Sequence, residues 1–311
     1  MVKLYKNFII KKIHKGSIIL IGNFDGVHLG HQKLLNTLIK VGKQTESETV
    51  IVTFFPHPRI VLFPEQELKL INTMDENIAM FKSFGINHLI FQNFDQKFSR
   101  ITSLEYTRNI LLQKIGLKDL IIGYNHHFGR NREGSIENLN EFSDLYDFNI
   151  HEVGPHRLEG KEISSTKIRN ALNGGHIDLA NQYLGYSFKL SGIVEQGNRV
   201  GTNIGFPTAN VRIENSNKIV PKDGVYAVKV HCLKNCFLGM LNIGFKPTFN
   251  TNHKSIEVHI FDFSKNIYNE KITIEFIKRI RNEKKFPTVD QLKSQLVMDK
   301  ITVLNIFNQA S

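Results

Sequence analysis

Two histidines three residues apart, His28 and His31, end a glycine-rich segment that starts at Gly22. The segment follows the apolar run 18–21, which predicts a buried strand, and leads into a helical pattern over 31–41. Glycine permits close approach of the backbone to a ligand, and a helix start presents free N–H groups to a phosphate. Imidazoles there can donate hydrogen bonds to phosphate oxygens and stabilise a departing pyrophosphate. An ordinary loop with two solvated histidines is the alternative, and the position between a strand and a helix favours the phosphate site.

A second candidate phosphate site begins with three consecutive hydroxyl residues, Ser164, Ser165 and Thr166. They open a helical pattern whose first turns carry Lys167 and Arg169. Hydroxyl and cationic groups at a helix start can bind a phosphate, whereas a capped surface helix has the same composition. The pattern alone leaves both interpretations open.

A third polar segment, 123–134, follows another strand-like run. Asn125 could hydrogen-bond a ribose or a base, and Arg130 could meet a phosphate, although a structural loop explains each residue equally well. The turn 54–59 also follows a strand, but Pro56 and Pro58 fix backbone angles, so this turn could be structural alone.

The second half of the chain has a different glycine-rich segment, 192–210. Neither a Gly-x-x-x-x-Gly-Lys-Ser/Thr motif nor the protein-kinase signatures occur. Thr208 and Asn210 supply oxygen ligands of the kind that Mg²⁺ accepts, and an extended chain would point both side chains to one face. The segment contains three glycines, Gly197, Gly201 and Gly205. They predict either a flexible loop that covers phosphates or a plain hairpin connection.

A carboxylate, Glu257, lies in the strand-like run 255–263. Alternation places it on one face with His259, Phe261 and Phe263. A carboxylate beside aromatic residues can act as a general base toward a hydroxyl, whereas a surface glutamate is the alternative.

Two kinds of element must position these residues. Up to about residue 185, short apolar runs alternate with helical patterns, which predicts a parallel sheet with helices on its faces. Ligands of such sheets bind beyond the carboxyl ends of the strands. The strands are expected at 18–21, 50–55, 88–91, 120–122 and 148–153, with helices at 31–41, around 78–84 and at 104–114.

After residue 185, strand-like segments follow one another without intervening helices, which predicts an antiparallel barrel. A final helix is expected at 289–298, with Thr288 as its N-cap. We therefore divide the chain into domains 1–185 and 186–311. The barrel strands are expected at 188–194, 224–230, 237–242, 256–263 and 272–276.

Composition narrows the function classes. The chain has 311 residues and a formal net charge of +11, which favours phosphate-bearing partners such as nucleotides, nucleic acids or anionic membranes. The basic residues are dispersed, which argues against nucleic-acid binding. Cys232 and Cys236 lack partners for a zinc site and predict two reduced thiols. No run approaches the ~20 apolar residues that span a bilayer, and no leader pattern is present, so we expect no membrane association and a cytoplasmic location.

The first half resembles the FMN adenylyltransferase module of bacterial bifunctional riboflavin kinase/FAD synthetases, within the broad nucleotidyltransferase superfamily. The resemblance is carried by 22–31 together with Ser164, Ser165, Thr166, Ile168 and Arg169. It implies a Rossmann-like fold and places His28 and His31 at the phosphates of ATP, with catalytic roles. Asn125 matches a family position, whereas His126 stands where the family more usually has Phe. The implied ATP-binding set is Gly22, Asn23, Phe24, Asp25, Gly26, His28, Gly30, His31, Asn125, Arg130, Ser164, Ser165, Thr166 and Arg169.

The second half resembles the riboflavin kinase module, a small β-barrel. The match runs from 192 through Pro207-Thr208-Ala209-Asn210 and Glu257 to 280–286 and the final helix. It implies that Thr208 and Asn210 bind Mg²⁺ and that Glu257 takes the proton of the ribityl 5′-hydroxyl. Thr202 stands where the family commonly has Arg. The implied ATP- and flavin-binding set is Gly197, Gly201, Gly205, Phe206, Pro207, Thr208, Asn210, Arg281, Glu283 and Phe286.

The resemblance thus implies an enzyme with two ATP-using sites. Riboflavin and ATP would give FMN and ADP in the barrel, and FMN and ATP would give FAD and pyrophosphate in the first domain, with Mg²⁺ as cofactor. The alternative is a single-activity FMN adenylyltransferase whose barrel only binds flavin.

Overall fold

The computed structural model describes residues 2–9, 13, 16–124, 128–130, 133–197, 200–248 and 251–309. The chain folds into two compact units, Met1–Ser165 and Thr166–Ser311. Each unit has the architecture that the sequence predicts, a parallel sheet in the first and an antiparallel barrel in the second.

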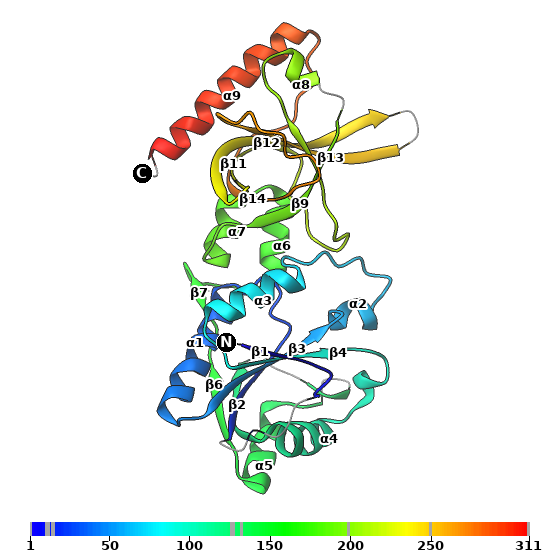
Figure 1. The fold of residues 1–311 in the computed structure, drawn as a ribbon. Helices are drawn as coiled ribbons and strands as arrows, with labels where there is room; N and C mark the ends of the chain where they lie inside the picture. The colour runs from blue at the N-terminus through cyan, green and yellow to red at the C-terminus, as the bar shows by residue number, and fades with distance from the viewer. Residues whose placement is uncertain are drawn as a thin grey trace. The chain divides into compact units, whose positions relative to one another are not determined.

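The sheet of the first unit is built from strands that pair in parallel in the order β1-β4-β3-β2-β5-β6 (Figure 1). Its central strand, β2, is fully buried along its length because apolar side chains meet helices on both faces. The strands are β1 (Lys3–Lys6), β2 (Ser17–Ile21), β3 (Glu48–Phe55), β4 (His88–Asn93), β5 (Leu117–Gly123) and β6 (Asn149–Val153).

Helices cover both faces of this sheet (Figure 1). One core contains Leu35 and Leu38 of α1 (Leu29–Gln44) and Phe81 of α3 (Met74–Ser83), packed against Ile18 and Leu20. The opposite core is formed by the π-helix η2 (Tyr106–Ile115) and α5 (Ile136–Tyr146). Short elements join them: α2 (Pro58–Leu62), η1 (Phe98–Arg100), α4 (Ser103–Glu105), β7 (Arg157–Leu158) and β8 (Lys161–Glu162).

The strand order reverses at β2, since the chain continues from β2 to β3 on one side and returns to β5 on the other. In open parallel sheets, ligands bind beyond the carboxyl ends of the strands at such a reversal of strand order. The segments that follow these two strands are those from Gly22 and from Tyr124.

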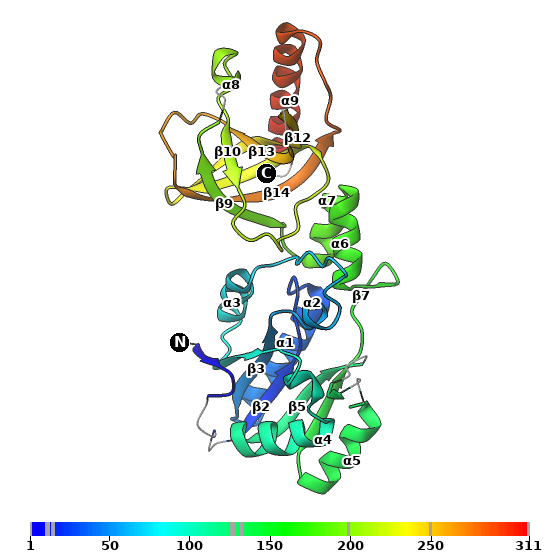
Figure 2. The ribbon, with the colours of Figure 1, turned by 90° about the vertical axis from the view of Figure 1, so that its right-hand side faces the viewer.

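The second unit begins with α6 (Ser165–Gly174) and α7 (Ile177–Leu184) and continues into a closed barrel in the order β10-β13-β12-β11-β14-β9 (Figure 2). Alternating side chains of β14, such as Ile272, Ile274 and Phe276, are buried, as the period of a strand requires. The elements are β9 (Lys189–Glu195), α8 (Val200–Asn203), β10 (Ala209–Arg212), β11 (Gly224–Cys232), β12 (Asn235–Thr248), β13 (Thr251–Ile260), β14 (Lys271–Arg281) and α9 (Val289–Gln309).

Helix α9 packs against β11, β12 and β14, and Val303 on its inner face is buried with Phe206 and Met240. The hydroxyl of Thr288 accepts the backbone N–H of Gln291, which confirms the predicted N-cap. The predicted end at 298 is wrong, because Val303 and Leu304 continue the apolar stripe against the barrel.

Further elements differ from the prediction. The edge strand β1 was missed, since its polar sequence carries no strand pattern and its pairing with β4 holds it. The predicted helix 104–114 is α-helical only at its start and then π-helical. A short helix, α8, interrupts the predicted glycine loop, and β13 ends at Ile260 before the left-handed turn at Asp262.

Candidate functional sites

The first candidate site is the loop between β2 and α1. Phe24 and Val27 adopt φ angles of 51° and 35°, although both are bulky and buried. Such left-handed backbone is strained for these side chains and persists only where packing imposes it. Gly26 has φ 84°, and a Cβ there would also meet Ile71. The loop is therefore held in one shape that brings the backbone to the start of α1.

His28 is the N-cap of α1, and its ring Nδ1 accepts the backbone N–H of His31 at 3.4 Å. Because Nδ1 accepts, the neutral ring carries its hydrogen on Nε2, which makes Nε2 the donor of this side chain. Gly30 lies directly behind this ring, and a Cβ there would stand 3.1 Å from it. The motif thus presents a histidine donor at the positive end of a helix.

The ring of His31 stacks on His28 at 3.6 Å between centroids and meets the edge of Phe24 at 5.4 Å. Its Nδ1 is buried and has no hydrogen-bond partner among the described residues. Burial lowers the pKa of His31 well below its ordinary value, and the neighbouring His28 lowers it further. A buried polar atom without a partner is costly and is expected where a ligand completes the site.

Asp25 links three segments of this unit. Its Oδ1 accepts the backbone N–H groups of Ile71 at 2.8 Å and Asn72 at 3.3 Å. Its carbonyl accepts the hydroxyl of Ser165 at 2.9 Å. This last bond brings Ser164 and Ser165 to the histidine loop, as the two separate sequence motifs require.

The remaining predicted residues of this site differ in position. Gly22 directly faces the Phe24 ring, and Asn23 is exposed, with its carbonyl accepting Thr53 at 3.5 Å. The side chain of Arg130 is exposed. Thr166 and Arg169 belong to the second unit, where Arg169 Nη2 donates to Thr166 Oγ1 at 3.5 Å. Asn125, His126 and His127 lie outside the described residues.

Aromatic side chains that the sequence analysis did not single out gather near the same edge of the sheet. Phe54 is the second-last residue of β3, and its ring lies 5.8 Å from those of Phe94 and Phe98. Tyr106 packs on Phe98 at 5.9 Å, and its buried hydroxyl has no partner within the described part of the chain. Phe54 lies near the end of one parallel strand and Phe94 directly follows another, and that position was the available signal.

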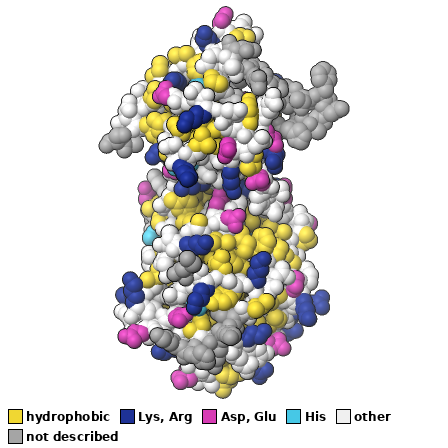
Figure 3. Space-filling view, in the orientation of Figure 1, with side chains coloured by type: hydrophobic (Ala, Val, Ile, Leu, Met, Phe, Trp, Pro, Cys, Tyr) yellow, Lys and Arg dark blue, Asp and Glu magenta, His cyan; other side chains and the backbone are white. Residues whose placement is uncertain are grey.

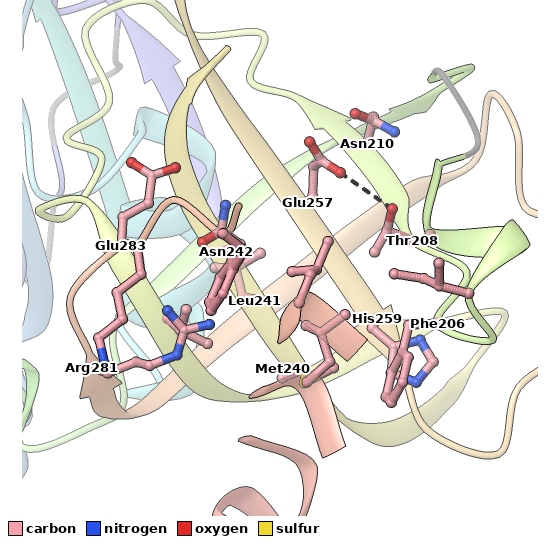
Figure 4. Close-up of a pocket in the computed structure, with 17 residues that line it drawn as sticks. Phe206, Thr208, Asn210, Met240, Leu241, Asn242, Glu257, His259, Arg281 and Glu283 are labelled. Carbon is pink, nitrogen blue, oxygen red and sulfur yellow. Dashed lines mark hydrogen bonds between the residues drawn. The ribbon is translucent and has the colours of Figure 1, made fainter. Parts of the chain in front are cut away.

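The second candidate site is a pocket of about 420 Å³ in the barrel unit. Strands β12 and β13 form its floor, and the segment before β10 and the segment after β14 form its walls (Figure 4). Eight predicted residues line it: Gly201, Phe206, Thr208, Asn210, Glu257, Arg281, Glu283 and Phe286.

Glu257 stands at the centre of a polar group in this pocket. The hydroxyl of Thr208 donates to Glu257 Oε2 at 3.3 Å, and Asn210 lies beside them (Figure 4). Strand pairing explains the meeting, because Glu257 is in register with Asn210 of β10 and with Asn242 of β12. Hydroxyl, amide and carboxylate oxygens of three strands or strand ends thus face one space.

The glycines of this site make room for its polar groups. Asn210 packs so closely on Gly197 that a Cβ could not be accommodated there, and Gly201 is equally close to the carbonyl of Phe206. Gly205 is exposed with φ 84°. Gly197, Gly205 and Pro207 are thus neighbours of the pocket rather than part of its lining.

At the other side of the pocket, Arg281 is fixed by Asp299 of α9. Its guanidinium donates to both carboxylate oxygens, with Nε–Oδ1 at 2.9 Å and Nη2–Oδ2 at 2.6 Å. It also lies over the ring of Phe286 at 5.9 Å. Glu283 packs against Gly244. Arg281 therefore shapes this wall while its charge is balanced by a buried carboxylate.

Several lining residues were not predicted as site residues: Ile204, Val225, Met240, Leu241, Asn242, His259, Lys284, Leu292 and Leu296. His259 shares the face of Glu257, so alternation along the strand was sufficient to find it. The apolar residues could not be found in this way, because they come from β11, β12, α9 and the segment after α8 and meet only through the barrel. Within the described residues, no cluster of three or more His, Cys, Asp or Glu could hold a metal.

Two family models match different parts of the chain. The FAD synthetase family model matches residues 10–167, and the riboflavin kinase family model matches residues 184–307. The bifunctional riboflavin kinase/FMN adenylyltransferase of Buchnera aphidicola subsp. Schizaphis graminum is 40% identical over 304 residues, which is 96% of each chain. The protein of the same name from Bacillus subtilis is 34% identical over 98% of this chain and 96% of its own. The chain belongs to the bifunctional riboflavin kinase/FMN adenylyltransferase family.

A solved structure from Streptococcus pneumoniae has the same fold throughout, with a TM-score of 0.89 at 30% identity over 98% of this chain and 99% of its own. That protein is described as a macrolide-efflux protein. The two family models that match the present chain describe FAD synthetase and riboflavin kinase instead. Within the described part of the chain, every helix is too short or too polar to span a bilayer. On the face that Figure 3 shows, Lys and Arg side chains are dispersed rather than gathered in one patch.

Proposed function

We propose that the chain makes FAD from riboflavin in two ATP-dependent steps at two separate sites. The barrel unit phosphorylates riboflavin to FMN and releases ADP. The first unit transfers the adenylyl group of a second ATP to FMN and releases pyrophosphate. The observation that carries this proposal is one chain with a histidine-capped helix start at the carboxyl edge of a parallel sheet and, in the order of the two family models, a barrel pocket around Glu257.

In the adenylyl transfer, a phosphate oxygen of FMN attacks the α-phosphorus of ATP, and the bond to the β-phosphate oxygen breaks. The attacking oxygen is already ionised, so the chain has no need of a strong general base. Its contribution is to hold the phosphates in line and to stabilise the charge of the departing pyrophosphate. The donors for this role are Nε2 of His28, the ring of His31 and the free N–H groups of α1.

The remaining predicted ATP contacts complete this proposal. Ser164 and Ser165 are held beside the histidine loop by the bond from Ser165 to Asp25, and their hydroxyls suit the phosphate side. Asn23, Asn125, Arg130, Thr166 and Arg169 stay predictions from the sequence. For the flavin ring of FMN, we propose the aromatic cluster around Phe54 and Phe98, since flat aromatic ligands stack on such rings.

In the kinase step, Glu257 accepts the proton of the ribityl 5′-hydroxyl as its oxygen attacks the γ-phosphorus of ATP. The hydrogen between Thr208 and Glu257 belongs to the threonine hydroxyl, so Glu257 Oε2 is the acceptor of this bond. Phe286 and the apolar floor around Met240 and Leu241 provide the surface for the flavin ring.

Thr208 and Asn210 are the residues that we propose to hold Mg²⁺. The donor set fits a hard cation, because a hydroxyl and an amide oxygen face the same space as the Glu257 carboxylate. Bound there with ATP, the ion would supply positive charge that offsets the charge of the phosphates.

Two further assignments follow from this function. Helices α6 and α7 belong to the same compact unit as the barrel, whereas the phosphate motif that begins at Ser164 serves the first reaction. We therefore propose 1–185 and 186–311 as the functional division. Since both reactions consume ATP, we place them in the cytoplasm.

One assay tests the proposal and its alternative. The purified chain is incubated with riboflavin, ATP and MgCl₂, and FMN and FAD are separated by chromatography. Both products are expected, and both should vanish with EDTA. FAD from added FMN without any FMN from riboflavin would instead support the single-activity adenylyltransferase with a flavin-binding barrel.

A further inference from the structure

His259 is a nearly buried histidine of the kinase pocket to which the proposed chemistry gives no role. It lies on β13 two residues after Glu257 and is 8% exposed. Its Nδ1 is 2.7 Å from the carbonyl oxygen of Pro207. A carbonyl only accepts hydrogen bonds, so Nδ1 carries a hydrogen and donates it. Burial lowers the pKa of His259, with a further contribution from Lys300 of α9, while the Pro207 bond and Asp262 act in the opposite direction.

Two aromatic rings fix the orientation of this imidazole. Phe206 meets it nearly edge-on at 5.2 Å between centroids, and Phe261 lies tilted at 5.6 Å. Lys300 closes the outer side, with its Nζ 5.2 Å from the Phe261 ring. The ring is therefore held by packing, and its Nδ1 hydrogen has one direction in which to point.

The segment that receives this hydrogen bond lies just outside the pairing of β10 with β13. Pairing between β10 and β13 comprises Ala209 with Val258 and Asn210 with Glu257. Before Ala209 the chain continues into Pro207, which has no N–H to extend a ladder. The His259 side chain donates to the carbonyl of Pro207 and so fixes the peptide group immediately before Thr208.

Alternate residues of β13 therefore hold the same short segment at two points. Glu257 accepts the Thr208 hydroxyl at 3.3 Å, and His259 donates to Pro207 one residue earlier. A shift of Pro207 would carry Thr208 and Asn210 with it, because they are chain neighbours. The orientation of Thr208 and Asn210 thus depends on the bond between His259 and Pro207, which involves neither of these two side chains.

We propose that His259 is a positioning residue for phosphoryl transfer, whose Nδ1–H holds Pro207 so that Thr208 and Asn210 face Glu257. This role rests on the proposed kinase function. It predicts that loss of the hydrogen-bond donor raises KM for ATP in the barrel even when a ring is kept at position 259.

The test compares two replacements in the full chain. His259→Phe keeps a ring between Phe206 and Phe261 but has no donor, whereas His259→Asn keeps a donor at the δ position without the ring. For FMN formation, we expect His259→Phe to raise KM for ATP about tenfold, as displaced ligands require, while KM for riboflavin changes little. We expect His259→Asn to recover most of the ATP affinity.

Two internal controls accompany these variants. FAD synthesis from added FMN, measured on the same preparations, should be unchanged and reports that the first unit is folded, whereas the unchanged KM for riboflavin reports that the barrel is folded. His231→Phe is the matched histidine control in the same barrel, because His231 is half exposed, bonds Glu275 and lies outside the pocket. Its kinase constants should equal those of the unmodified chain.

The outcomes separate this role from the function on which it rests. An unmodified chain that forms no FMN would overturn the kinase assignment and this role together. An active chain whose His259→Phe variant keeps an unchanged KM for ATP would overturn the positioning role alone. Equal increases in KM for ATP and for riboflavin, found in both His259→Phe and His259→Asn, would likewise show that His259 contributes packing alone.

Discussion

The His31 ring lies between His28 and Phe24, with a pKa lowered by burial and by the neighbouring imidazole. In the unfolded chain the pKa of His31 returns to its ordinary value of 6.5, so the unfolded state binds the proton more readily than the folded state. Stability from the neutral ring is therefore complete above about pH 6.5 and is lost as pH falls toward the lower pKa of the folded chain.

Thermal unfolding should show this dependence on pH. The test compares pH 7.5 with pH 5.5, which lie on either side of about 6.5. The midpoint temperature for unfolding of the first unit should be lower at pH 5.5, and the decrease should be smaller in His31→Gln. Calorimetry across this range measures the difference between the two chains. A variant with the same pH dependence as the unmodified chain would show that His31 does not titrate differently on unfolding.

His28 serves the same site as a donor rather than as a buried base. Replacement by Ala removes Nε2–H and also the N-cap that accepts the N–H of His31. We expect kcat for FMN adenylylation to fall about 10²–10³-fold, the usual cost of one charge-stabilising donor. FMN formation from riboflavin should stay within twofold, roughly the scatter of a distant substitution, and a parallel loss of both activities in a folded variant would contradict the two-site proposal.

Glu257 makes the converse prediction for the barrel. Glu257→Gln keeps the shape of the side chain and can still meet the Thr208 hydroxyl, but it cannot take a proton. FMN formation should fall about 10²–10⁴-fold, as for the loss of a general base, and FAD synthesis from FMN should persist. Chromatography of FMN and FAD formed by one preparation measures both activities. Retained kinase activity would show that Glu257 is not the base.

At the scale of elements, the pair Arg281–Asp299 ties the end of β14 to α9. Asp299 is 3% exposed and also accepts Gln295 at 2.9 Å, so its charge is buried and fully partnered. Asp299→Asn leaves the Arg281 cation without its counter-charge. We expect the free energy of unfolding of the barrel to fall by about 3 kcal/mol and KM for riboflavin to rise, because the Arg281–Phe286 wall loses its anchor.

Urea unfolding and kinase kinetics together measure this effect. Asp290→Asn is the matched control, because Asp290 is an exposed residue in the first turn of the same helix. If Asp299→Asn were as stable as the control, the ion pair would contribute nothing to holding α9 on the barrel.

Elements also explain which parts of the structure the sequence could predict. The strand 18–21, the turn at Gly26 and the start of α1 follow from local patterns, and so does the face shared by Glu257 and His259. The edge strand β1 could not be predicted, since Tyr5 is held by stacking on His88, which is distant in sequence. Arg281 was predicted as a ligand contact, but its bond to Asp299 arises only when α9 folds onto the barrel.

At the scale of the whole molecule, each proposed activity depends on residues that the other reaction does not use. FMN is the product of the barrel and a substrate of the first unit, so either activity can be removed while the other continues. A chain with Glu257→Gln and a chain with His28→Ala should therefore complement each other when mixed. The first would lack FMN formation and the second FAD formation.

We expect each variant alone to make no FAD from riboflavin, and the mixture to make it after a lag in which FMN accumulates. The lag should shorten as the concentration of the His28→Ala chain rises, because that chain supplies FMN through solution. Sampling FMN and FAD over time by chromatography measures both phases. If the mixture formed no FAD while each chain kept its single activity, FMN would have to pass only within one chain, and the picture of two independent sites joined by a free intermediate would be wrong.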